Sequence, residues 1–198
     1  MRERRSSWAG SQVVATASAS EIPLTRAIVP VGAPHPLALR SLRSRALSGP
    51  ALQYASLQVP GLAERRLRSR SALEGLLRSW AGPHTREAVA EEAPYYAELL
   101  SRPGAARSAL EPLRNLMLSR AETAALERPV TVPVLSVQGQ LDPVQPAQAY
   151  ARDTHHVTGN LRQATIRRSG HFPQEEAPAE LVRALLPFLA AVAPAASA

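Results

Sequence analysis

The feature that most constrains this chain is a strand with an Asp in the turn after it and a Ser-Gly-His sequence about thirty residues later. The strand expected at residues 132–137 leads into a turn that carries Asp142, and the strand expected at residues 163–166 leads into a Ser-Gly-His sequence that ends at His171. Because the carboxyl ends of parallel strands meet at one edge of a sheet, we expect the two side chains to meet there. A buried carboxylate beside a histidine orients the ring and stabilises its charged form, as the acid–base half of a hydrolytic triad requires.

The rest of the chain divides into three stretches by its hydrophobic pattern. Residues 1–33 predict a small-residue helix at 10–20 and a buried strand at 26–31. Residues 34–128 show helical spacing broken by Pro and Gly, which predicts four or five short helices and no strand. Residues 129–198 return to alternating strands and helices, with helices expected at 146–154 and 179–192 and a kink at Pro187.

Composition excludes several classes of protein. The net charge of +7 comes from Arg alone and is scattered among Leu, and only 4% of residues are aromatic, so we do not expect a nucleic-acid partner. The chain has no cysteine, which excludes disulfides, Cys zinc sites and a Cys nucleophile and fits a reducing cytoplasm. No apolar run is long enough to span a bilayer, and no apolar core of a signal peptide follows the basic N-terminus. His155 and His156 lack a third ligand at suitable spacing, so we expect no metal.

Several short motifs then point to a known family. They are Ala33-Pro34-His35-Pro36, Leu57–Glu64, Arg114-Asn115, Gly139-x-x-Asp142-Pro143 and Gly170-His171-Phe172-Pro173-x-x-Glu176-x-Pro178. With them, from about residue 7 to residue 190, the chain resembles the α/β-hydrolase superfamily, in particular its branch of epoxide hydrolases and haloalkane dehalogenases. The resemblance implies an α/β fold: a partial α/β-hydrolase core, made of the C-terminal strands of a parallel sheet, with an all-helical cap inserted at 34–128.

The resemblance also implies roles for particular residues. Asp142 matches the triad acid and His171 the triad base. The branch carries its nucleophile in a Gly-x-nucleophile-Trp-Gly-Gly elbow, which matches Arg5-Ser6-Ser7-Trp8-Ala9-Gly10 and places Ser7 as the nucleophile. The backbone N–H of Trp8 would then be one oxyanion donor. Tyr54, in the cap, would be a pocket residue within reach of a substrate.

Departures from the branch pattern bear on the chemistry. Ser7 stands where the branch usually has Asp, which favours acyl transfer on an ester over displacement at an epoxide or a halide. Arg5 and Ala9 lie where a tight elbow favours small or Gly residues. Of the two ring-opening tyrosines of the cap, one position holds Leu113, and Tyr54 lies one residue out of register with the other. Epoxide hydrolysis is therefore disfavoured.

The elbow begins at residue 5, whereas the family places several strands and the second oxyanion donor before it. We therefore expect an N-terminally truncated form of a longer enzyme, or a gene remnant. The expected activity is hydrolysis of a small apolar ester, a small-molecule substrate, without a cofactor and in the cytoplasm. The alternatives are a non-catalytic remnant that binds a small ligand under the cap and, more distantly, a nucleic-acid-binding module. Nothing in the sequence indicates the oligomeric state.

Other polar and aromatic residues are expected to serve the structure. We expect His35 to be part of the turn that enters the cap. We expect the cap aromatics to lie in the core or in a pocket wall: Tyr54, Trp80, Tyr95 and Tyr96. Glu175 and Glu176 are expected to be solvated, or to lie near the start of the last helix, where negative charge is favourable.

Overall fold

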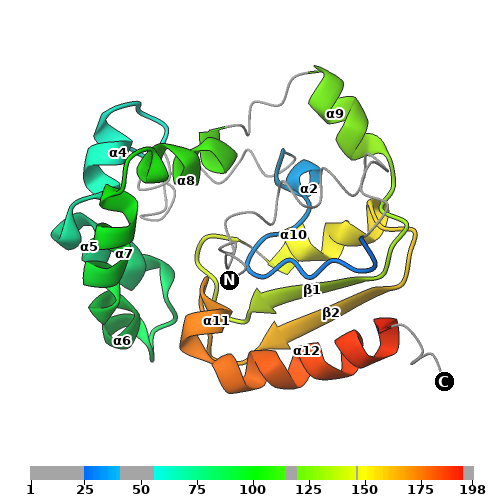
Figure 1. Ribbon diagram of the computed structural model, residues 1–198. Coiled ribbons are helices and arrows are strands. Elements are labelled where there is room, and N and C mark those ends of the chain that lie inside the picture. Colours follow the sequence, from blue (N-terminus) through cyan, green and yellow to red (C-terminus); the bar gives the residue numbers. More distant parts are fainter. Residues whose placement is uncertain (1–24, 41–55, 115–119, 146, 194–198) are drawn as a thin grey trace.

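A small parallel sheet with helices on both faces, and a separate group of helices at one end, make up the described part of the chain (Figure 1). The computed structural model describes residues 25–40, 56–114, 120–145 and 147–193. Strands β1 (Val134–Gly139) and β2 (Leu161–Ile166) run in the same direction, and their carboxyl ends point toward the separate helices.

The sheet is extended on the other side of β1 by residues 26–31. β1 pairs with β2 from Val134↔Leu161 to Gly139↔Ile166. Ile28 and Val31 form parallel bridges to Val134 and Val137 of β1. The order across the sheet is therefore residues 26–31, β1 and β2, which places β1 in the middle.

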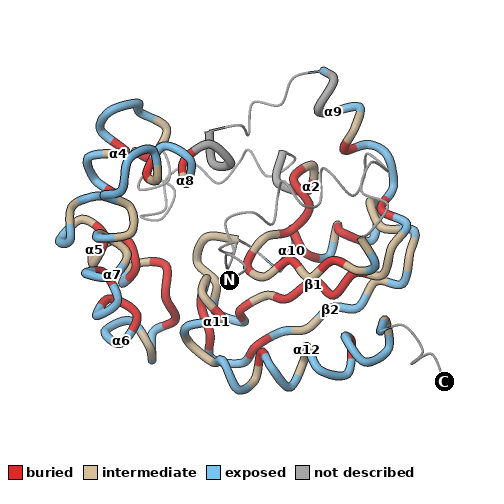
Figure 2. The backbone as a smooth tube through the Cα atoms, in the orientation of Figure 1, coloured by how far each residue is buried: buried red, intermediate tan, exposed pale blue. Residues whose placement is uncertain are grey.

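The two faces of β1 carry different chemistry because successive side chains of a strand point to opposite sides. One face packs on α12 (Pro178–Val192), in an apolar cluster of Leu135, Val137, Ile166, Leu181 and Phe188. On the other face lies α10 (Ala147–Ala151), which contacts β1. Here Ser136 donates a hydrogen bond to buried Asp153 (Oγ–Oδ2 2.8 Å). Figure 2 shows the buried backbone of β1 between these two layers, with the outer side of α12 exposed.

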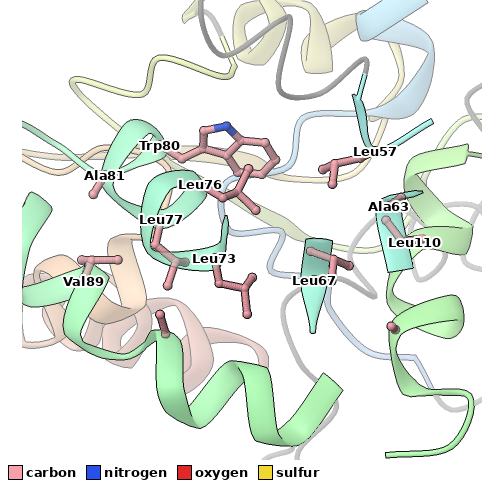
Figure 3. Close-up of a cluster of buried hydrophobic side chains, with 12 residues drawn as sticks. Leu57, Ala63, Leu67, Leu73, Leu76, Leu77, Trp80, Ala81, Val89 and Leu110 are labelled. Carbon is pink, nitrogen blue, oxygen red and sulfur yellow. The ribbon is translucent and has the colours of Figure 1, made fainter. Parts of the chain in front are cut away.

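The separate helices form their own apolar cluster. We call them the helical insertion: α4 (Leu62–Leu67), α5 (Arg70–Trp80), α6 (Arg86–Glu91), α7 (Ala93–Ser101) and α8 (Ala105–Arg114). Leu73, Leu76, Leu77 and Trp80 recur at helical spacing along α5 and are all buried. They pack against buried residues of the neighbouring helices, including Leu67, Val89 and Leu110 (Figure 3). Each buried leucine contributes roughly 1.5–3 kcal/mol, so the helices have a substantial core.

Among the described residues, four short helices remain outside the helical insertion and the two helices that pack on the sheet. They are α2 (Pro36–Arg40), α9 (Arg120–Glu127), the 3-10 helix η2 (Arg152–His155) and α11 (Pro173–Glu176). α2 contacts both α9 and α10, and α11 contacts α12. α11 also separates the sheet from the helical insertion in Figure 1.

The observed elements differ from the expected ones mainly at their ends. The expected strand at 132–137 begins two residues late, because Pro133 has no N–H to donate to a ladder. The expected strand at 26–31 forms two isolated bridges instead of a continuous ladder. The last helix runs through Pro187 as one element. The helix expected at 10–20 lies outside the described residues.

Candidate active site

Asp142 lies in the turn that follows β1, with its side chain almost wholly buried (1% exposed). Its Oδ1 accepts the backbone N–H groups of Val144 (2.8 Å) and Gln145 (3.0 Å). A carboxylate that accepts two backbone amides is held in one orientation, which leaves Oδ2 directed elsewhere.

Oδ2 of Asp142 faces His171, which follows β2. The distance from His171 Nδ1 to Oδ2 is 3.0 Å, and the imidazole is 17% exposed. With Asp142 ionised, Nδ1 carries the proton that Oδ2 accepts, so the lone pair lies on Nε2. That is the tautomer in which Nε2 can take a proton from a nucleophile. The structure thus brings together the two side chains that the strand ends predicted.

A third side chain, that of Tyr150 on α10, lies beside the Asp142–His171 pair. It was not singled out in the sequence. Its hydroxyl lies 3.4 Å from Oδ2 of Asp142. Burial, together with the nearby carboxylates of Asp142 and Asp153, raises the pKa of the Tyr150 phenol. The phenol therefore stays protonated and acts as a donor to the Asp142 carboxylate.

The backbone of His171 is held by the helical insertion. Its N–H donates to the carbonyl of Trp80 at the end of α5 (2.9 Å). The rings of Trp80 and Phe172 both pack edge-on against the imidazole, with centroids 5.2 and 5.3 Å away. The base is therefore fixed by a contact between segments that are far apart in the sequence.

Glu176 lies just before α12, as one of the two expected alternatives has it, but its carboxylate is bound and not solvated. Oε2 accepts from the N–H groups of Gly82 and Gly170 (both 2.8 Å) and from the hydroxyl of Thr85 (2.6 Å). Oε1 accepts from the N–H of Phe172 (3.0 Å). The hint in the sequence was that Glu176 is a position of the motif that begins at Gly170-His171. The partners Gly82 and Thr85 come from a loop that no local pattern connects to it.

An apolar cavity of about 390 Å³ lies between the helical insertion and the segment that follows His171. Its wall consists of Leu67, Leu73, Leu76, Leu77, Trp80, Tyr96, Leu99, Leu100, Ala109, Phe172, Gln174 and Glu175. Figure 3 shows several of the leucines beside the Trp80 ring. Trp80 and Phe172 link this cavity to the candidate base, because both also pack on His171. The expectation that the cap aromatics lie in the core or in a pocket wall is confirmed for Trp80 and Tyr96. It is wrong for Tyr95, which is 61% exposed.

Glu175, next to Glu176, also joins the His171 segment to the helical insertion. Its Oε1 accepts the hydroxyl of Tyr96 on α7 (2.7 Å). Burial and this carboxylate raise the pKa of Tyr96. Together with Gln174, the pair forms the polar part of a mostly apolar cavity wall.

A second buried polar group lies away from the Asp142–His171 pair. Asp153 accepts the backbone N–H of His35 (2.8 Å), and the His35 ring stacks on that of His156 with centroids 4.1 Å apart. Burial, with a smaller contribution from His156, lowers the pKa of His35 to about 3. Burial raises the pKa of Asp153. The neutral ring of His35 thus packs as part of the core, at the turn where the sequence predicted a structural role.

The other expected site residues, Ser7, Trp8 and Tyr54, lie outside the described residues, so their positions relative to His171 are not given. Within the described ranges, no group of three or more His, Cys, Asp or Glu side chains could hold a metal ion. Over the same ranges, no helix is both long and apolar enough to cross a membrane.

Comparison with known proteins gives matches at the level of three-dimensional structure. No protein-family model matches the chain, and no curated protein matches it in sequence. Cfl2 from Burkholderia cenocepacia is similar, with 27% identity over 86% of this chain and 59% of its own, at a TM-score of 0.65. Epoxide hydrolase A from Mycobacterium thermoresistibile has 22% identity over 91% of this chain and 66% of its own, at a TM-score of 0.62. A serine hydrolase involved in carbazole degradation has 18% identity over 92% of this chain and 60% of its own, at a TM-score of 0.57.

These likenesses define the class of fold. The chain has the α/β-hydrolase fold, with part of the parallel core and an inserted group of helices that corresponds to a cap. The expectation of this fold from the sequence is confirmed. The chain spans about 60% of the length of the solved structures that it matches first.

Proposed function

We propose that this chain carries the acid and base of a hydrolase that cleaves a small apolar ester. Ser7 would attack the ester carbonyl, His171 would take its proton and then deliver it to the leaving alcohol, and Asp142 would orient His171. The backbone N–H of Trp8 would donate to the oxyanion. The observation that carries the proposal is the 3.0 Å contact between buried Asp142 and Nδ1 of His171.

The proposed substrate class rests on the cavity between the helical insertion and the segment that follows His171. At about 390 Å³ it lies at the small end of sites for small molecules, and leucine side chains dominate its wall. This supports a short acyl or alkyl group bound beside Trp80 and Phe172, with the reacting carbonyl on the His171 side. The polar pair of Tyr96 and Glu175 would accommodate one polar atom of the substrate. The lack of cysteine is in keeping with a cytoplasmic setting, which we include in the proposal.

Hydrolysis of p-nitrophenyl acetate and p-nitrophenyl butyrate tests the proposal. We expect Ser7→Ala and His171→Ala each to lower the rate by at least about 100-fold, the lower end of what general acid–base catalysis contributes. Because free imidazole itself attacks nitrophenyl esters, the matched control is His84→Ala, which removes an exposed histidine outside the proposed site. Equal loss of rate in all three variants, or no loss in any, would rule out the triad.

A second candidate is a binding protein without catalysis. It is favoured by one observation: neither Asp142 nor His171 is among the residues that line the cavity. In that case, butyrate esters would raise the melting temperature of the chain, and no alcohol would be released. Epoxide hydrolysis is a weaker proposal, because Leu113 stands at one expected tyrosine position. Release of a diol from styrene oxide would support epoxide hydrolysis.

A further inference from the structure

One carboxylate connects the base segment to the helical insertion. The Glu176 carboxylate accepts four hydrogen bonds, all between 2.6 and 3.0 Å. Two of the donors, Gly82 and Thr85, belong to the loop between α5 and α6. The other two are the N–H groups of Gly170 and Phe172, on either side of His171.

The backbone around His171 is therefore held at three successive amides. Glu176 accepts the first and the third, and the Trp80 carbonyl accepts the N–H of His171 between them (2.9 Å). A backbone fixed at three consecutive positions has little freedom to rotate. The direction of the imidazole then depends on where the α5–α6 loop lies.

The two backbones pack so closely that neither Gly82 nor Gly170 has room for a side chain. A Cβ atom on Gly82 would lie 2.8 Å from both the Arg168 carbonyl and Oε2 of Glu176, and 2.9 Å from the Gly170 nitrogen. A Cβ atom on Gly170 would lie still closer to the Gly82 nitrogen. Because neither residue carries a side chain, the two backbones meet directly, and Glu176 accepts the N–H of each.

The chemistry at this point requires a carboxylate. All four groups donate, and an ionised carboxylate only accepts. A glutamine of the same shape would turn its amide N–H₂ toward at least one donor, which would lose a hydrogen bond and set two donors against each other. The negative charge of Glu176 therefore serves to position the backbone groups that donate to it.

We infer that Glu176 is a positioning residue: it joins the α5–α6 loop to the backbone around His171 and so sets the orientation of the His171 ring toward Asp142. The effect on rate rests on the proposed function, in which His171 is the base. The effect on the ring does not, because the Asp142–His171 hydrogen bond exists whether or not the chain catalyses a reaction.

The test is the NMR signal of the His171 ring in the full chain, with ¹⁵N-labelled histidine. The chain has five histidines, so the His171 ring signals can be assigned by their loss in His171→Ala. We expect Glu176→Gln to move the Nδ1–H proton and both ring nitrogens of His171, or to broaden them, as the contact with Asp142 loosens. Thr85→Val, which removes one donor from the loop side only, should shift the same signals in the same direction by less.

Glu180→Gln is the matched control. Glu180 also accepts a backbone N–H from the segment before His171, that of Arg167 (3.2 Å). Glu180→Gln removes one negative charge, as Glu176→Gln does. Glu180 makes no bond next to His171, so the ring signals should stay in place. Ring signals that move no more in Glu176→Gln than in Glu180→Gln would overturn the inference.

Kinetics separate this inference from the proposed function. If the chain hydrolyses the butyrate ester, Glu176→Gln should lower kcat about 10- to 100-fold, as a misplaced catalytic group does, with KM changed far less. Unchanged kcat in an active chain would overturn the effect on rate. If the chain is inactive, the proposed function fails while the NMR result still decides the role of Glu176.

Amide exchange in the unaltered protein decides the matter if Glu176→Gln does not fold. The N–H groups of Gly82, Gly170 and Phe172 should exchange at least about 100-fold more slowly than exposed loop amides, because all three donate to one carboxylate. Exchange of these three amides at the rate of exposed loops would show that the connection does not persist in solution, and the inference would fall.

Discussion

Replacing Asp142 by Asn tests the candidate site most sharply, because the two carboxylate oxygens have different partners. Oδ1 accepts the N–H groups of Val144 and Gln145, and a carboxamide oxygen can accept both as well. Oδ2 accepts from His171 Nδ1 at 3.0 Å. In Asp142→Asn an N–H₂ group takes that place, so Nδ1 must become the acceptor and the proton moves to Nε2.

The magnitude follows from the tautomer. A ring with its proton on Nε2 cannot take a proton from a nucleophile, and in a Ser-His-Asp triad this change lowers kcat about 10⁴-fold. That factor corresponds to about 5.5 kcal/mol of activation free energy. The stability should change much less, by about 1–3 kcal/mol, because one charged hydrogen-bond partner is lost while both backbone bonds remain.

The assay combines kcat for the butyrate ester with urea unfolding of the same samples. Asp153→Asn is the matched control: Asp153 is also buried and also binds a backbone N–H and a side-chain hydroxyl, but it makes no contact with His171. We expect Asp153→Asn to change the stability by a similar amount. Its kcat should stay within about threefold of that of the unaltered chain, because Asp153 does not touch His171. The reasoning is refuted if Asp142→Asn keeps kcat within tenfold of the unaltered chain.

Three further predictions concern the buried groups. Because the pKa of His35 is lowered from 6.5 to about 3, the unfolded chain binds the extra proton first on acidification, so the free energy of unfolding should fall by about 2 kcal/mol from pH 7 to pH 5. Urea unfolding at both pH values measures this, and His35→Gln should flatten the dependence. Gly170→Ala should destabilise the chain by about 1–3 kcal/mol, because the added Cβ would meet the α5–α6 loop. The same change should shift the His171 ring signals. A stability equal to that of the unaltered chain would contradict the close packing. Leu110→Ala should cost about 2–5 kcal/mol in thermal or urea unfolding, because Leu110 is fully buried in the helical insertion, and a cost below 1 kcal/mol would contradict that core.

The candidate acid and base could be placed from the sequence because the signal is local. A buried strand is a short apolar run, and the residue that follows its end lies at the edge of the sheet whatever the rest of the fold does. Asp142 follows such a run in β1, whereas β2 before His171 is half polar, is exposed at half of its positions and ends in buried Ile166. The meeting of Asp142 and His171 required only that the two strands be parallel neighbours. The helical spacing of Leu73, Leu76 and Leu77 was equally local and marked the buried face of α5.

By itself, then, the sequence determined the class of fold, the meeting of Asp142 with His171 and the helical nature of the described parts of residues 34–128. The tertiary structure alone decided what holds His171 in place. Glu176 was expected to be solvated or to lie near the start of the last helix, yet its carboxylate also binds Gly82 and Thr85, about ninety residues away in the chain. Tyr150 was not singled out in the sequence, yet its hydroxyl reaches Asp142. Neither contact has a periodic pattern, because a hydrogen bond between distant segments depends on how the elements pack and not on the residues beside it in sequence.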